Sequence, residues 1–182
     1  MATERHLAPV PSPEPSATPS PMVLRDVMSS FATGITVLTA AGTHCHGMTA
    51  NAFSSVSLEP PMVLCCIART ARMHEALLCT RSFGVSVLSA DQEHLARYFA
   101  KRGRPKGMAQ FDNVEWFPAR RSGAPLLAGS LAWLECEVAE VYDGGDHSIF
   151  LSTVLEATRR SGEALLFFGG SFHQGMRAPR SA

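Results

Sequence analysis

The chain has 182 residues, which is enough for one domain with a buried core. Its 16 basic residues balance its 16 acidic residues, so charge gives no reason to expect nucleic acid or an anionic membrane as a partner. Because no apolar run is long enough to span a bilayer, we expect a soluble, cytoplasmic protein without a membrane partner.

The N-terminal segment, residues 1–21, holds six of the 12 prolines and almost no large apolar side chain. Such a segment buries too little surface to offset its ordering entropy, and it has no apolar core of a signal peptide. We therefore predict a disordered tail over residues 1–21, one domain over 22–176 and a frayed end over 177–182.

The first half of the domain alternates between helical and strand patterns. An amphipathic helix is predicted over residues 24–34, ended by Gly34, and the β-branched run 35–40 predicts a strand. The continuous apolar run 61–68 predicts a strand covered on both faces, and residues 68–78 predict a helix with Thr70 as its N-cap.

The second half is richer in strands. Alternation predicts a strand over 82–88, and Ser89 with Gln92 forms a capping box for a helix over 90–101 that ends by Gly103. Residues 130–142 alternate Leu134, Cys136 and Val138 against Glu135 and Glu137, until the polar Glu140 falls on the apolar side and predicts a bulge. The turn "DGGD" then leads to a strand over 147–157, and 164–170 predicts the final strand. Six or seven strands joined mainly by turns predict a mostly β, antiparallel barrel with two or three helices.

Two segments offer groups that could bind a ligand. The stretch "MTANAFSSVSLEPP" (48–61) alternates small hydroxyls with apolar residues, which fits either a half-exposed strand or a surface that hydrogen-bonds a polar, planar ligand. In "IARTAR", a strand runs into a helix N-terminus, where free amides with Arg69, Thr70 and Arg72 could bind an anion. The alternative for "IARTAR" is a solvated basic turn. Together the two segments suggest a phosphorylated planar ligand.

Two further residues could lie at the mouth of a site. His147 follows a tight turn, where Asp146 could orient its ring, and Phe172 follows paired glycines and could stack on a ligand. Both could instead be purely structural. No GxSxG, GxGxxG or Walker A motif is present, and "HCH" at 44–46 has no second ligand pair, so we expect no metal site. The five cysteines lack a CxxC pair and are expected to be reduced. These features fit a cleft in which a redox cofactor supplies the chemistry.

An ordered set of motifs over about residues 24–175 resembles the short flavin reductase family, the reductase component of two-component flavin-dependent monooxygenases. The motifs are "FATGITVLTA", "GMTANAFSSVSLEPPMVLCCI", "FGVSVLSADQEHLARYFA", "FD" (111–112), "GAPLLAGSLAWLECEV" and "GDHSIFLSTVLEA". The final element departs from the family pattern, since Ser171 precedes Phe172 and His173 follows it.

The resemblance implies an FMN-binding split β-barrel of the antiparallel Greek-key type that reduces FMN or FAD with NADH, or with NADPH. It implies a homodimer, which the apolar segments "LLFF" and "AWLECEV" also favour, and a monooxygenase partner that receives reduced flavin. It implies a nicotinamide-side role for His147, and flavin contacts from Met48, Thr49, Ala50, Asn51, Ser54, Ser55, Val56, Cys66, Ile67, Ala68, Arg69, Arg72, Phe99, Ala100, Lys101, Arg102 and Phe172.

Three questions stay open at this stage. A barrel that binds flavin or haem without reductase turnover is one alternative function, and an FMN-dependent oxidase of the pyridoxamine-phosphate type is another. For the choice between NADH and NADPH, no arginine cluster is evidently reserved for a 2′-phosphate, although Arg102, Arg104 and Lys106 could bind one.

Overall fold

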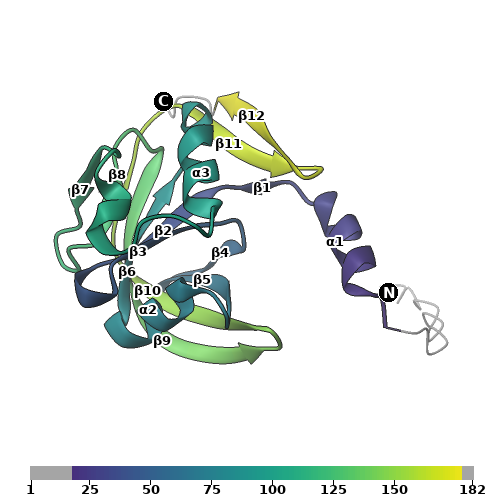
Figure 1. The fold of residues 1–182 in the computed structure, drawn as a ribbon, viewed down its shortest axis with the longest axis horizontal. Helices are drawn as coiled ribbons and strands as arrows, with labels where there is room; N and C mark the ends of the chain where they lie inside the picture. Colours follow the sequence, from purple (N-terminus) through teal and green to yellow (C-terminus); the bar gives the residue numbers. More distant parts are fainter. Residues whose placement is uncertain (1–17, 178–182) are drawn as a thin grey trace, which may run out of the picture.

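The computed structural model describes residues 18–177, so most of the predicted tail and all but one residue of the predicted frayed end lie outside the described residues. The body is built on a seven-stranded antiparallel sheet in the order β3-β2-β6-β9-β10-β5-β4 (Figure 1). Its strands are β2 (Thr36–Ala40), β3 (His46–Ala50), β4 (Phe53–Leu58), β5 (Pro61–Ala68), β6 (Ser82–Val87), β9 (Ala132–Gly144) and β10 (His147–Arg159). The two edge strands, β3 and β4, follow one another in the chain.

Two smaller sheets complete the β structure. One has the order β1-β11-β12, from β1 (Thr33–Gly34), β11 (Glu163–Phe168) and β12 (Ser171–Arg177), and the other pairs β7 (Trp116–Pro118) with β8 (Pro125–Leu127). The strands predicted near 35–40, 61–68, 82–88 and 147–157 are confirmed. The prediction that the chain's last strand lies within 164–170 is wrong, because β12 follows it.

The long β9–β10 hairpin confirms the predicted bulge. Leu151 pairs with Glu140, and the next residue, Ser152, pairs with Val138, so Ala139 is the extra residue. The alternation predicted in β9 is only partly correct, because Glu135 is buried on the side expected to face solvent. The amides of Arg121 and Ser122 donate to its carboxylate, which satisfies the buried charge.

The helices begin and end differently from the sequence prediction. Helix α1 (Pro21–Ser29) ends before Gly34, which lies in β1 instead. Helix α2 (Arg72–Thr80) has Ala71 as its N-cap residue, so the predicted cap at Thr70 is wrong. The capping box at Ser89 is confirmed, but it opens a 3-10 turn, η2 (Ala90–Gln92), and helix α3 (Glu93–Ala100) ends before Gly103. The remaining 3-10 turns are η1 (Gly42–His44) and η3 (Gly107–Phe111).

The core consists of two main apolar clusters. Leu38, Ile67, Phe83 and Phe150 belong to the cluster packed against α2, and Phe99 of α3 lies in the other. Strand β5 buries one face fully and the other only partly, so the prediction that both faces are covered is wrong. Strand β6 also shows no alternation of buried and exposed side chains, because Gly84 and Ser86 are buried together with Phe83 and Val85.

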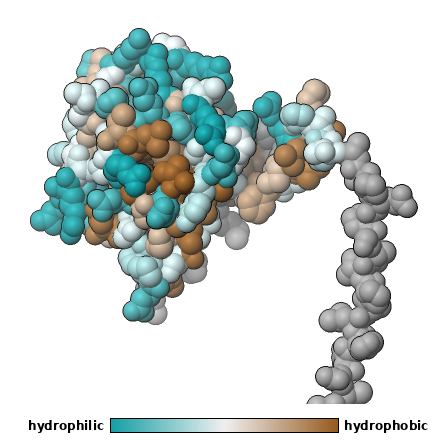
Figure 2. All heavy atoms as spheres, turned by 90° about the horizontal axis from the view of Figure 1, so that it is seen from below, coloured by the Kyte–Doolittle hydropathy of each residue, from teal (hydrophilic) through white to brown (hydrophobic). Residues whose placement is uncertain are grey.

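Helix α1 projects from the body as an arm (Figure 1). None of its residues is buried, and apolar side chains such as Met22, Val27 and Met28 are exposed along it. In the space-filling view, apolar residues appear both on this arm and in a hollow of the body (Figure 2). Between residues 18 and 177, no helix has the length and apolar character required to cross a membrane.

Candidate functional site

A pocket of about 510 Å³ opens where β3, the end of β5, the start of α2 and the end of α3 meet. Small side chains leave this space open, since Ala68, Ala71 and Ala100 lie along it, and Phe99 supplies an aromatic wall. The full lining is His46, Met48, Thr49, Ala68, Thr70, Ala71, Arg72, Phe99, Ala100, Lys101, Arg102, Arg104 and Pro105.

The lining of the pocket is strongly cationic. Arg72, Lys101, Arg102 and Arg104 contribute four positive charges, and none of the described residues that line it is acidic. Burial, followed by the nearby charges of Arg104 and Arg72, lowers the pKa of His46 to about 4. The His46 imidazole is therefore neutral at pH 7, and the pocket favours an anionic ligand.

The start of α2 strengthens that preference. Arg72 is the first residue of the helix, and the N-cap residue Ala71 offers no side-chain hydrogen bond to the free amides of the first turn. Ala71 and Arg72 both line the pocket, so the start of α2 lies at the pocket wall. A phosphate group is the type of anion that such a helix terminus binds.

Eight of the residues predicted to contact flavin line this one pocket. They come from three separate parts of the chain and are Met48, Thr49, Ala68, Arg72, Phe99, Ala100, Lys101 and Arg102. The hydroxyl of Thr49 donates to the carbonyl of Ala96 at 2.7 Å, so it ties β3 to α3.

The other predicted flavin contacts on β3, β4 and β5 do not line the pocket. Asn51, Ser54, Ser55 and Val56 are exposed on or beside β4, the edge strand of the sheet. Ala50 and Ile67 are buried in the core, and Cys66 is half-buried on β5. The segment 48–61 thus forms two strands with a break at Asn51, and only its first part reaches the pocket.

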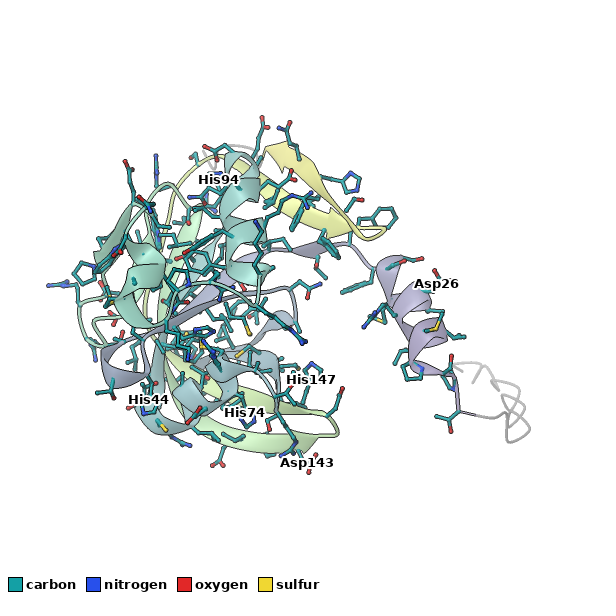
Figure 3. All side chains as sticks on the ribbon, in the orientation of Figure 1. Asp26, His44, His74, His94, Asp143 and His147 are labelled. Atoms are coloured by element: carbon teal, nitrogen blue, oxygen red, sulfur yellow. The ribbon has the colours of Figure 1, made fainter. Side chains whose placement is uncertain are left out.

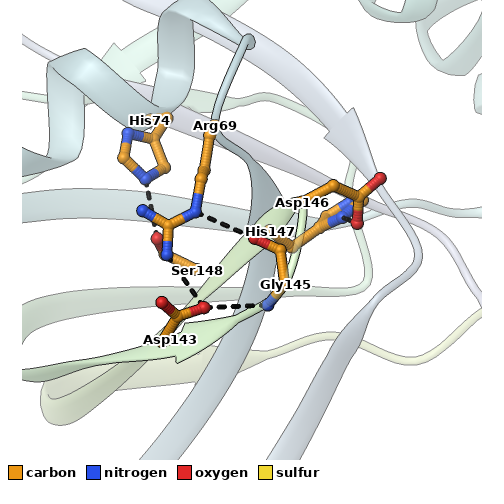
Figure 4. A network of polar contacts seen from close by, with 7 residues as sticks. All are labelled: Arg69, His74, Asp143, Gly145, Asp146, His147 and Ser148. Atoms are coloured by element: carbon orange, nitrogen blue, oxygen red, sulfur yellow. Dashed lines mark hydrogen bonds and ion pairs between the residues drawn. The ribbon is translucent and has the colours of Figure 1, made fainter.

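Arg69 binds the β9–β10 turn and not the pocket (Figure 4). Its guanidinium pairs with the Asp143 carboxylate at 3.0 Å and donates from Nε to the carbonyl of Gly145 at 3.0 Å. Its own amide donates to the carbonyl of Asp146. The Gly145 amide and then Arg69 lower the pKa of Asp143, so this ion pair is present at neutral pH. Arg69 therefore fixes the turn that precedes His147.

His147 is not among the residues that line the pocket, but it is paired with one that does. It pairs across the sheet with Ala68, a lining residue, and its Nδ1 lies 2.7 Å from the Asp146 carboxylate, which can only accept. The expectation that Asp146 orients this ring is met in the geometry. Figure 3 shows His147 in the same region of the body as His74 and Asp143, and His74 contacts the Ser148 hydroxyl at 2.9 Å.

Phe172 lies away from the pocket. Its ring packs against Phe167 and beneath the guanidinium of Arg97, 4.8 Å from the ring centroid. It packs against the apolar cluster around α3, and it is not among the residues that line this pocket.

Five lining residues are not among the predicted flavin contacts, namely His46, Thr70, Ala71, Arg104 and Pro105. From the sequence, His46 stands out only as part of "HCH", and Arg104 only as a candidate for binding a 2′-phosphate. In the structure, Arg104 donates to the backbone carbonyls of Phe99 and Gly47, each at 2.6 Å. A basic residue shortly after a helix end is the one signal that could have indicated this contact. Within residues 18–177, no group of three His, Cys, Asp or Glu side chains is arranged to hold a metal ion.

Residues 28–176, nearly the whole described chain, match the family described as flavin reductase like domain. The chain belongs to this family. The reductase is 51% identical over 152 residues to an NADH-dependent FAD reductase of Streptomyces globisporus, covering 83% of this chain and 84% of that protein.

Two solved structures are similar to the reductase along most of its length. One is the NADH:FAD oxidoreductase SgcE6 of Streptomyces globisporus C-1027 in complex with NAD and FAD fragments, with 47% identity, a TM-score of 0.81 and coverage of 90% of this chain and 96% of that one. The other is BorF, the flavin reductase component of a bacterial two-component tryptophan halogenase, with 50% identity, a TM-score of 0.81 and coverage of 84% and 96%.

These similarities decide several predictions made from the sequence. The family, the mostly β split-barrel fold class, the flavin reductase function and the use of FMN or FAD with NADH are confirmed. Independently of these similarities, the lining of the pocket fits a flavin, because it combines an aromatic wall, four cations and a helix N-terminus in about 510 Å³.

Proposed function

We propose that the reductase binds FAD or FMN in the cationic pocket, reduces it with NADH in the cytoplasm and passes the reduced flavin to a separate monooxygenase. The observation that carries the choice of site is the meeting of Arg72, Lys101, Arg102 and Arg104 with the uncapped start of α2. The similarity to an NADH-dependent FAD reductase and to the reductase component of a two-component halogenase supports FAD and a separate partner enzyme.

Different residues of the pocket would contact different parts of the ligand. Arg72 and the first amides of α2 would hold the flavin phosphate, and Lys101 and Arg102 would hold further phosphate charge. Phe99, Met48 and the alanines would contact the apolar parts of the ligand. The bound flavin supplies the redox chemistry by accepting a hydride from NADH.

His147 would act on the nicotinamide side of the site. Arg69 and Asp146 fix its backbone and its ring, so the ring is held in place before the ligand arrives. A positioned donor of this kind orients a nicotinamide by hydrogen bonding and reduces the orientation entropy that the reaction must overcome.

The pocket assignment is tested by a matched pair of variants. Arg72→Gln removes a lining charge, and Arg159→Gln removes an exposed arginine at the far end of β10. We expect Arg72→Gln to weaken flavin binding by about 10- to 100-fold, as for a lost charge-assisted hydrogen bond, with Arg159→Gln unchanged. Equal flavin affinity in both variants would place the flavin elsewhere.

One assay on the wild-type protein distinguishes a reductase from a barrel that binds flavin without turnover. NADH consumption is followed with FMN, with FAD and without flavin. We expect consumption that depends on flavin. Flavin binding without NADH consumption would favour the module that only binds.

The reductase is proposed to be a homodimer, and α1 supports this. A nine-residue helix with no buried residue is not stable alone in water, so its exposed apolar side chains Val27 and Met28, with Phe31 just after the helix, need a covering surface. We expect Val27→Glu to shift the mass measured by light scattering from dimer towards monomer, with Arg25→Gln as the control on the same helix. A wild-type monomer at micromolar concentration would contradict the proposal.

A further inference from the structure

Arg104 connects two elements that form the walls of the pocket. Its guanidinium donates to the carbonyls of Tyr98 at 3.3 Å and Phe99 at 2.6 Å, and also to that of Lys101, all at the end of α3. A further nitrogen donates to the carbonyl of Gly47 in β3 at 2.6 Å. One side chain therefore links the end of α3, the loop after it and an edge strand of the sheet.

These contacts are electrostatically favourable. The last carbonyls of a helix have no partner within the helix and carry partial negative charge, which a cation at the C-terminus offsets. The guanidinium carbon also lies 5.5 Å from the centroid of the Phe99 ring and 5.9 Å from that of Tyr98, within the range of a cation–π contact. The planar fork of an arginine suits several acceptors at once, whereas a lysine ammonium acts as a single point charge.

The loop held in this way carries much of the pocket lining. Lys101, Arg102 and Pro105 all line the pocket, and Lys101 and Arg102 are exposed. Between residues 101 and 106, all of which the structure describes, Arg104 is the only residue whose side chain makes a hydrogen bond. The position of this wall therefore depends on Arg104.

The burial of Arg104 argues that it does more than stabilise the fold. Its Nε is buried and has no hydrogen-bond partner among the described residues. Partial burial lowers the pKa of Arg104, Tyr98 offsets part of this effect, and the nearby charge of Arg72 adds a smaller lowering effect. Burying a charged group has a free-energy cost that a well-packed apolar residue would avoid. A role in shaping the pocket accounts for that cost.

We propose that Arg104 is a positioning residue that sets the 101–105 wall of the flavin pocket through backbone carbonyls, and that it does not itself bind the ligand's phosphate. Because the guanidinium donates to several backbone carbonyls at once, a positive charge alone at this position would not hold the wall in place. The proposal rests on the proposed function only in naming flavin as the ligand.

The test compares Arg104→Gln, Arg104→Lys and the remote control Arg159→Gln. Flavin affinity is measured by fluorescence titration with FAD, kcat at saturating FAD, and amide hydrogen exchange on the protein without flavin. For both Arg104 variants we expect a rise of about tenfold in the Kd for FAD, a change in kcat of less than about threefold, and loss of exchange protection confined to residues 98–105 and β3. The control should match wild type in every measurement.

Three results would overturn the proposal. Wild-type affinity in Arg104→Lys would show that the charge acts without the fork, and unchanged protection at residues 98–105 would show that the loop does not depend on Arg104. Global unfolding of both variants would make Arg104 a residue of the fold alone. A wild-type protein that oxidises no NADH would refute the proposed function, while the exchange measurement without flavin would still decide the role of Arg104.

Discussion

Replacing Gly47 by alanine should disturb both the core and the pocket. Gly47 lies in β3, and a Cβ atom there would lie 2.5 Å from Cε1 and 2.7 Å from Cδ1 of Phe99, and 3.1 Å from Cζ of Phe111. Carbon atoms in contact prefer about 3.5 Å, so the Phe99 ring must move by about 1 Å. Phe99 is buried and packs against Phe111 with ring centroids 5.4 Å apart, so it has little space in which to move.

Overpacking of this kind costs about 1–3 kcal/mol of unfolding free energy. The displaced ring also lines the pocket, so we expect weaker flavin binding in the folded protein. Urea denaturation and FAD titration measure the two effects. Gly34→Ala is the matched control, since nothing lies within 4 Å of a Cβ atom at that position, and it should be neutral or stabilise by up to about 1 kcal/mol. If Gly47→Ala is as stable as the control and binds FAD with wild-type affinity, the tight contact between β3 and Phe99 is not real.

Three further predictions concern charges and the nicotinamide side. The pKa of His46 is lowered to about 4, so the unfolded chain takes up a proton before the folded one as the pH falls below about 6.5. The free energy of unfolding should therefore drop by about 1–2 kcal/mol between pH 7 and 4, after allowance for solvent screening. In urea denaturation, His46→Gln should reduce this drop. Burial alone would raise the pKa of Glu135, but hydrogen bonds from Ser122, Arg121 and Arg120 outweigh it and lower the pKa. Stability from Glu135 is therefore present above its ordinary pKa and lost in acid below it, and Glu135→Gln should cost about 1–3 kcal/mol at pH 7 in the same denaturation assay. His147→Ala should lower kcat/KM for NADH by a factor that corresponds to about 1–3 kcal/mol of lost transition-state stabilisation, with little change in the flavin Kd. Lost flavin binding with normal NADH kinetics would make His147 a structural residue.

Local sequence signals predicted the features that depend on neighbouring residues. The bulge at Ala139 followed from the polar Glu140 on an apolar face, and the capping box followed from the spacing of Ser89 and Gln92. In both cases the pattern lies within a few residues, and the structure adds no competing contact. The same holds for the turn before His147.

Features that depend on distant parts of the chain were missed. Strands β7 and β8 have three residues each, too few for a period to appear, and β12 contains Gly175 and polar residues without clear alternation. Thr70 looked like an N-cap, but α2 begins two residues later and leaves Thr70 on the pocket lining.

The pocket itself was predictable in part. The resemblance assigns Cys66 to Arg69, Arg72 and Phe99 to Arg102 to one ligand, and the structure brings Ala68, Arg72 and the segment from Phe99 to Arg102 together. The roles of Arg69 and Arg104 depend on backbone carbonyls from elsewhere in the fold, which no local pattern reveals. Similarly, Ile67 is buried because its side chain faces the core side of β5.

The central claim, that this pocket holds a flavin which NADH reduces, is tested most directly without oxygen. The protein with bound FAD is mixed with one equivalent of NADH under anaerobic conditions, and the absorbance of oxidised flavin is followed in the wild type and in Arg72→Gln. The account predicts rapid loss of oxidised-flavin absorbance in the wild type, and in Arg72→Gln the same loss only at a higher FAD concentration. Flavin that stays bound and oxidised after NADH is added would contradict it.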